Sequence, residues 1–323
     1  MVFLKSMSLV KAQMEPLLIA ILLGFSSFST VSLASSSPAI LTSIKPLQLI
    51  IATMHKPLLQ HDINLEVSTL LPPGSTPHDY VLKPSDIAQV LQADLIIWMG
   101  PVVEPYLVSV IARADQDKVI DVSLLEGLKR LAFRELLEND KGHDEDKHHD
   151  HDEMLQFDPH IWWSVDNAEI IAARVLATLD VQGGSAETRA NEKRSIVRQA
   201  MQPIRSLLSN KQTQAIKQKP SFILFHDGLQ YLESDLGVLS VARVALSDDH
   251  RPGIKTLLAL KQKVKVDQVV CVVAETNTNV SIIHKIEAST PLRQIVIDSL
   301  GWGQENYHDM LQHAYDEILT CHW

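Results

Sequence analysis

Residues 83–101, KPSDIAQVLQADLIIWMGP, contain a helix start and a buried strand in direct succession. Ser85 or Asp86 can cap the helix, because short polar side chains accept hydrogen bonds from the free N–H groups of a first helical turn. The apolar run Asp94–Met99 is expected to form a buried strand that ends at Gly100. A helix that leads into a continuously apolar strand is typical of a βαβ unit, which predicts a parallel sheet covered by helices.

Neighbouring segments extend this pattern. Leu47–Thr53 is a short apolar run that fits a strand, and Asn64–Leu71 is a second candidate that ends in a Pro-Pro-Gly turn. Val119–Val122 is expected as a further strand of the same unit. The stretch Asn139–Glu153 is so rich in charge that it is expected to be a solvated loop.

A long helix and a second set of alternating elements follow the loop. Glu187 to about Lys217 carries an apolar stripe at helical spacing, with Pro203 as a candidate kink. Strands are expected at Ser221–Phe225, Val238–Leu246, Val266–Ala274 and Gln294–Ile297, with helical patterns at Ile254–Lys263, Val280–Glu287 and Glu305–Leu319.

These patterns predict an α/β fold of two similar lobes, each with a parallel sheet flanked by helices. A long rigid helix joins the lobes. The expected boundaries are 35–185 for the first lobe, with the charged loop at 139–153, then 186–217 for the helix and 218–323 for the second lobe.

The N-terminus resembles a secretory signal. Lys5 and Lys11 precede the apolar run Pro16–Phe28, and small residues follow up to Ala34. This order predicts a signal peptide over 1–34, cleaved after Ala34, and export to the periplasm. A signal anchor is the alternative, but the run is short of the about 20 residues that a membrane span needs.

The amino-acid composition limits the classes of partner that the protein is expected to bind. The chain has 323 residues, 46% of them hydrophobic, which is enough for two globular domains. Its formal charge of −10 becomes −11 without the leader, because the leader holds two lysines and one glutamate. An acidic protein of this kind is not expected to bind nucleic acid or anionic lipid.

Only two cysteines occur, Cys271 inside an apolar run and Cys321 near the end. Export would place both in an oxidising compartment, so a disulfide between them is expected. Two inert thiols or metal ligands are the alternatives.

Three histidines and one aspartate occupy the places where α/β sheets bind ligands. His78 follows a predicted strand by a turn, His160 precedes a predicted helix, and His226 directly ends a strand. Asp298 ends the last strand. Three imidazoles with a carboxylate or a water form a tetrahedral site suited to zinc, although any one histidine could equally be a local hydrogen-bonding residue.

Several motifs resemble the zinc-binding members of the solute-binding proteins of ABC importers (cluster A-I). They are SIKPLQLI (43–50), PPGSTPHDYVLKPSD (72–86), ADLIIWMGPVVEPYL (93–107), DPHIWWS (158–164), FILFHDG (222–228) and VIDSLGW (296–302). The resemblance covers the mature chain and includes the histidine-rich insertion and the late cysteine pair.

The resemblance implies that the metal lies in the cleft between the lobes. It makes His78, His160 and His226 the zinc ligands and Asp298 the neighbouring carboxylate. Pro77 stands where some relatives carry a glutamate, and Ser299 replaces the proline that usually follows the aspartate. The fourth ligand is therefore left open between Asp298 and water.

The stretch GHDEDKHHDHDE (142–153) is a second place where metal could bind. It carries four histidines, His143, His148, His149 and His151, and seven carboxylates lie between Asp140 and Glu153. A floppy loop must be ordered before it coordinates a metal, so weak binding at several stoichiometries is expected. The loop is predicted to be an accessory that collects cations for the cleft; a solvated face with incidental affinity is the alternative.

The function predicted from these features is periplasmic capture of Zn²⁺ and its delivery to an inner-membrane ABC permease with a cytoplasmic ATPase. The protein would be a monomeric carrier without enzymatic activity. A zinc hydrolase is one alternative, although no HExxH motif occurs. A periplasmic zinc buffer or metallochaperone that stores metal on the loop is another, and a manganese or iron carrier is a close variant.

Overall fold

The computed structural model describes residues 38–77, 80–134, 157–179, 185–245, 253–276, 278, 283 and 291–323. Predictions that concern the leader, His78 and the histidine-rich loop lie outside these residues. The described helices include none that is long and apolar enough to cross a membrane.

The first lobe is built on a parallel sheet of four strands in the order β2-β1-β3-β4. Its strands are β1 (Ala39–Thr42), β2 (Glu66–Thr69), β3 (Leu95–Trp98) and β4 (Val119–Asp121), and the helices among them are α2 (Lys45–Ala52), α3 (His55–Leu59), α4 (Pro84–Gln92) and α5 (Val108–Ile111). The predicted strand-and-helix unit of 83–101 is confirmed as α4 and β3. Asp86 caps α4 from its first turn, where Oδ2 accepts the Lys83 N–H at 2.8 Å.

One predicted strand is wrong. The run Leu47–Thr53 forms most of helix α2, and the first strand is β1, a segment that the sequence pattern did not single out. Leu47, Leu49, Ile50 and Ile51 are all buried, and Gln48 is the one polar residue between Leu47 and Ala52, so the run is too short to show a helical period. A short helix of this kind cannot be told from a buried strand by its pattern.

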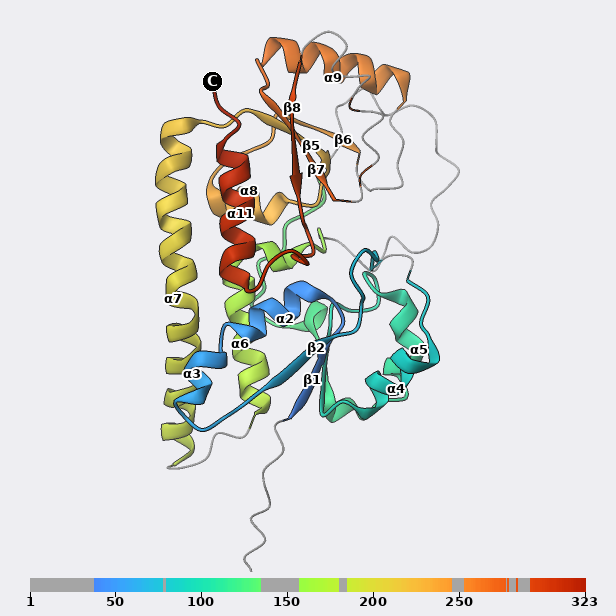
Figure 1. The fold of residues 1–323 in the computed structure, drawn as a ribbon, viewed down its shortest axis with the longest axis vertical. Coiled ribbons are helices and arrows are strands. Elements are labelled where there is room, and N and C mark those ends of the chain that lie inside the picture. The colour runs from blue at the N-terminus through green and yellow to red at the C-terminus, as the bar shows by residue number, and fades with distance from the viewer. Residues whose placement is uncertain are drawn as a thin grey trace, which may run out of the picture. The chain divides into compact units, whose positions relative to one another are not determined.

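The second lobe repeats the arrangement with a parallel sheet in the order β6-β5-β7-β8 (Figure 1). Its strands are β5 (Phe222–His226), β6 (Ala242–Ala245), β7 (Cys271–Glu275) and β8 (Arg293–Ile297), and its helices include α8 (Gln230–Leu236), α9 (Ile254–Val266) and α11 (Tyr307–Leu319). The predicted strand that began at Val266 is too long, because Val266 is the last residue of α9.

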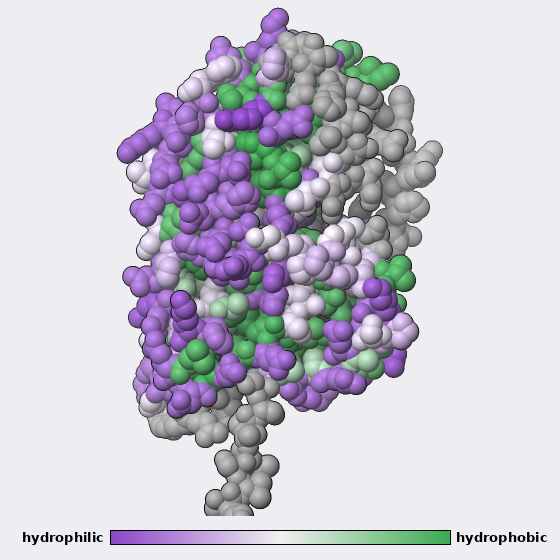
Figure 2. All heavy atoms as spheres, viewed as in Figure 1, coloured by the Kyte–Doolittle hydropathy of each residue, from purple (hydrophilic) through white to green (hydrophobic). Residues whose placement is uncertain are grey.

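Helix α7 (Ala186–Gln218) is the predicted long helix, 33 residues in length with Pro203 in its interior. It runs along both lobes and packs against α6 (Val165–Thr178) and α11 (Figure 1). Its buried residues include Ile196, Met201 and Ile204, whereas the surface over α7 in Figure 2 is predominantly hydrophilic. This polarity fits a helix that buries one stripe and leaves the rest in water.

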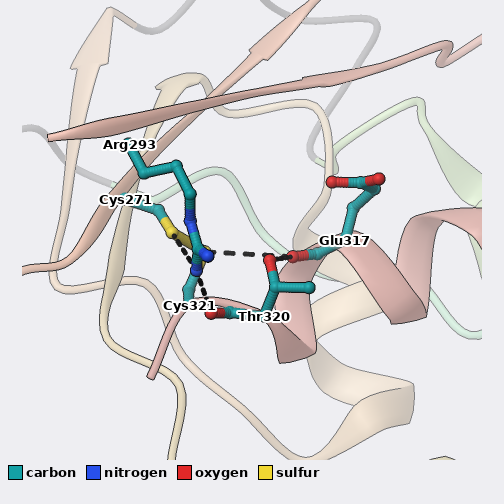
Figure 3. The surroundings of a disulfide bond; sticks show 5 residues. All are labelled: Cys271, Arg293, Glu317, Thr320 and Cys321. Carbon is teal, nitrogen blue, oxygen red and sulfur yellow. Dashed lines mark hydrogen bonds between the residues drawn. A yellow bond between two sulfur atoms is a disulfide. The ribbon is translucent and has the colours of Figure 1, made fainter. Parts of the chain in front are cut away.

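The predicted disulfide between Cys271 and Cys321 is confirmed (Figure 3). It joins the first residue of β7 to the segment after α11, and both cysteines are fully buried. Arg293 lies beside it and donates to Cys271 Sγ at 3.4 Å and to the Thr320 carbonyl. The bridge therefore ties the sheet of the second lobe to the last helix.

Candidate metal site

The candidate site lies at the carboxyl edge of the second sheet. His226 is the last residue of β5, Glu275 is the last residue of β7, and Asp298 directly follows β8. Since β5, β7 and β8 are adjacent and parallel, their carboxyl ends meet at one edge. Three polar residues that are far apart in the sequence are thus brought to the same place.

His226 and Glu275 form a buried pair. His226 Nδ1 lies 2.8 Å from Glu275 Oε1, and the two side chains are 8% and 14% exposed. Burial alone would raise the pKa of Glu275, but the hydrogen bond from His226 and the charges of His226 and His160 hold it at about 2. Glu275 is therefore an ionised carboxylate that orients the imidazole.

Gly228 makes room for this pair. A Cβ atom at Gly228 would lie 2.7 Å from Glu275 Oε1 and 3.0 Å from His226 Nδ1, both closer than a carbon normally approaches. The glycine of the FHDG motif is thus required by the carboxylate–imidazole pair, and any side chain there would displace it.

His160 is held by a carboxylate of its own. It stands directly before the short 3₁₀ helix Ile161–Trp163 and two residues after Asp158. Asp158 Oδ1 accepts the His160 backbone N–H at 2.9 Å and lies 2.7 Å from His160 Nδ1. The rings of His160 and His226 are 5.1 Å apart between centroids, at 72° to each other.

The other predicted site residues have different outcomes. Asp298 is half-buried, and its Oδ2 accepts the Gly303 N–H at 2.8 Å, so one oxygen is already used in a local turn. His78 and the loop histidines lie outside the described residues. Within the described part of the chain, no group of three His, Cys, Asp or Glu side chains is gathered closely enough to hold a metal ion. The four-residue ligand set thus stays a prediction.

Sequence reasoning missed the two carboxylates that hold the imidazoles. Both had a signal: Asp158 stands two residues before a candidate ligand, and Glu275 ends the strand expected to neighbour the one that ends in His226. A metal-bound histidine generally donates its second ring N–H to a carboxylate, so both positions were worth testing.

Asp227, next to His226, belongs to a separate cluster of buried charges. It pairs with the Arg134 guanidinium and lies 3.9 Å from Arg243 Nε, and Arg134 also lies 2.6 Å from Glu233 Oε2. Asp227 is thus committed to a structural ion cluster.

Two parallel-sheet lobes joined by a long helix are the architecture of a two-lobed solute-binding protein. Residues 40–321 match a protein family whose description is "Zinc-uptake complex component A periplasmic". The chain belongs to this family. The predicted family, its fold and zinc as its ligand are thereby confirmed.

Individual relatives agree with this. The high-affinity zinc uptake system protein ZnuA of Yersinia pestis is 26% identical over 307 residues, covering 88% of this chain and 92% of that protein. The protein of the same name from Haemophilus ducreyi is 29% identical over 311 residues, covering 87% and 92%.

Solved structures with the same fold include a crystal structure of ZnuA, at a TM-score of 0.69 and 19% identity over 89% of this chain and all of that one. The cadmium-bound periplasmic metal binding protein of Candidatus Liberibacter asiaticus has a TM-score of 0.66 at 18% identity, over 88% of this chain and 98% of that one.

Proposed function

We propose that this chain captures Zn²⁺ in the periplasm and delivers it to an inner-membrane ABC permease driven by a cytoplasmic ATPase. The observation that carries the proposal is the pair of imidazoles, His160 and His226, each bonded through Nδ1 to its own buried carboxylate. Such bonds fix the tautomer and the ring orientation that a zinc ligand needs. The protein acts as a monomeric carrier and catalyses no reaction.

The proposed site takes its third imidazole from His78 and its fourth ligand from Asp298 or a water. Neutral imidazoles and tetrahedral geometry favour zinc over manganese, which prefers more oxygen ligands. Because each histidine must lose its proton to bind, acid weakens the site.

The remaining features have supporting roles in this proposal. Residues 1–34 form a leader that is cleaved after Ala34. The loop histidines, His143, His148, His149 and His151, concentrate zinc outside the tight site. The proposed lobe boundaries are 35–185 and 218–323, with the helix between them; the first sheet lies within the former range and the second within the latter.

The zinc hydrolase alternative needs a carboxylate that is free to act as a general base. Glu275 and Asp158 are bonded to the histidines, and Asp227 is bonded to Arg134. These partners disfavour a hydrolase and fit a site that only holds its metal.

The test is calorimetric titration of the metal-free protein with zinc, for the wild type and for His160→Ala and His226→Ala. Both variants should lose at least about a hundredfold in affinity, because removing a ligand should cost more than removing the carboxylate that is bonded to it. His308→Ala is the control, since His308 also contacts an aspartate, Asp309, at 3.3 Å but lies on α11. Wild-type affinity in both site variants would refute the proposal.

A further inference from the structure

The segment that carries His160 is bonded to the second lobe at several points, although it precedes that lobe in the sequence. The Tyr231 hydroxyl, from α8, donates to the Asp158 carbonyl at 2.8 Å. The Tyr307 hydroxyl, from α11, donates to the Trp162 carbonyl at 2.6 Å, and Trp162 Nε1 donates to the Ser299 carbonyl at 3.1 Å. Three elements of the second lobe therefore hold the residues on both sides of His160.

The start of α6 is attached in the same way. Asp235 of α8 accepts the Val165 N–H at 2.7 Å through Oδ2, and its Oδ1 pairs with Lys129 Nζ at 2.9 Å. The carboxylate lies at a helix N-terminus, where the free N–H groups and the helix dipole favour negative charge. His160 and His226 are thus carried by one bonded unit, which preserves the 5.1 Å spacing of their rings.

Tyr231 connects this unit to the site most directly. Its side chain is fully buried, and its hydroxyl both donates to Asp158 and accepts the Leu131 N–H at 3.0 Å. Asp158 in turn holds His160 at its backbone nitrogen and at Nδ1. A buried hydroxyl with both bonds satisfied has one orientation, so the position of Asp158 is determined by α8.

We infer that Tyr231 is a positioning residue for metal binding: through Asp158 it fixes His160 to the second lobe at the distance from His226 that one zinc ion requires. The inference rests on the proposed function of His160 and His226 as zinc ligands. According to this inference, His160 is attached to the second lobe by hydrogen bonds, although it precedes that lobe in the sequence.

The experiment compares Tyr231→Phe with Tyr315→Phe by calorimetric zinc titration. Tyr315 is fully buried on α11, and its hydroxyl makes no hydrogen bond within the described residues, so it is a matched control for the loss of a buried hydroxyl. Tyr231→Phe should weaken zinc binding about tenfold, the upper range for one neutral hydrogen bond. Tyr315→Phe should leave it unchanged, and equal affinities in the two variants would overturn the inference.

A second measurement distinguishes a positioning role of Tyr231 from a general loss of protein stability. In the His160→Ala background, Tyr231→Phe should cause no further loss of affinity, because the imidazole that it positions is absent. An undiminished tenfold loss in that background would overturn the inference. If Tyr231→Phe does not fold, Tyr307→Phe takes its place in the same cycle, with the same expected and contrary results.

These results are distinguishable from a failure of the proposed function. If the wild type binds one zinc tightly and His226→Ala does not, the function stands whatever Tyr231→Phe shows. Cobalt absorption spectra add a direct readout, because a displaced imidazole alters the visible bands of Co²⁺, and Tyr315→Phe should not alter them.

Discussion

Two glutamates lie at or after the carboxyl ends of equivalent strands of the two sheets, and their surroundings shift their pKa values in opposite directions. Glu104 follows β3 in the first lobe, where its Oε2 accepts the Met99 N–H at 2.8 Å and its Oε1 lies 3.3 Å from the Tyr106 hydroxyl. Burial raises the pKa of Glu104 to about 7, because the hydrogen bonds that it accepts only partly offset the desolvation. Glu275 ends β7 and faces His226, which keeps its pKa at about 2.

The difference separates a carboxyl that is bonded to the backbone from one that is bonded to a candidate zinc ligand. The strand order is the same in both sheets, so topology alone does not decide which edge takes a metal. In the second sheet the strand beside β7 ends in His226, which pairs with Glu275, whereas Glu104 is bonded to the Met99 N–H and the Tyr106 hydroxyl, both of which follow β3. The comparison predicts effects on stability in the first lobe and on zinc affinity in the second.

The largest expected effect comes from the disulfide, which lies in the second lobe. Replacing Cys271 and Cys321 together by serine should lower the free energy of unfolding by about 4 kcal/mol, from the entropy of closing a loop of this length. Urea unfolding of the metal-free protein measures the loss. The reduced wild type is the control and should match the double variant; equal stability of the oxidised and reduced forms would contradict the prediction.

The second effect is the pH dependence caused by Glu104. Its pKa is about 7 in the folded protein and 4.5 in the unfolded chain, so the folded state holds the proton more tightly. The stabilisation is fully present below pH 4.5 and is lost as the pH rises through 7, a change of about 3 kcal/mol.

Glu104→Gln should remove this dependence, because the amide keeps an acceptor for Met99 and carries no charge. Urea unfolding of both proteins from pH 4.5 to 8 gives the comparison. Parallel pH profiles for wild type and variant would show that Glu104 titrates normally.

The third effect concerns Glu275 and tests the other side of the comparison. Glu275→Gln should weaken zinc binding about 10–100-fold, as is usual when the carboxylate behind a metal-bound histidine is removed. Glu104→Gln is the matched control, since it makes the same substitution at a buried glutamate of the first lobe and should leave zinc affinity unchanged. An equal loss in both variants would mean that the two carboxyls do not differ in role.

The smallest effect is expected from deleting residues 142–153. The tight site should keep its affinity within about a factor of two, as for changes to exposed segments elsewhere. Calorimetric titration of the deletion variant should show that only the weak additional zinc sites are lost. Loss of the tight site would favour the buffer alternative, in which the loop is the main store of metal.

The sequence by itself determined the class of fold, because apolar strands and a 33-residue helical stripe are local patterns. It also predicted the cysteine pair, which is confirmed, and it gave His160 and His226 as candidate ligands from their places beside predicted strands and helices. It did not show that Leu47–Thr53 is helical, since a short run of mostly apolar residues fits a buried strand as well as a helix.

Only the tertiary structure decided which carboxylates hold the imidazoles and to which lobe His160 is attached. Glu275 reaches His226 across 49 residues because β5 and β7 are neighbours in register. Tyr231 reaches Asp158 across 73 residues because α8 packs against the segment that carries His160. Such pairings depend on strand order and helix packing, which arise from burying the whole core and leave no mark on any single stretch of sequence.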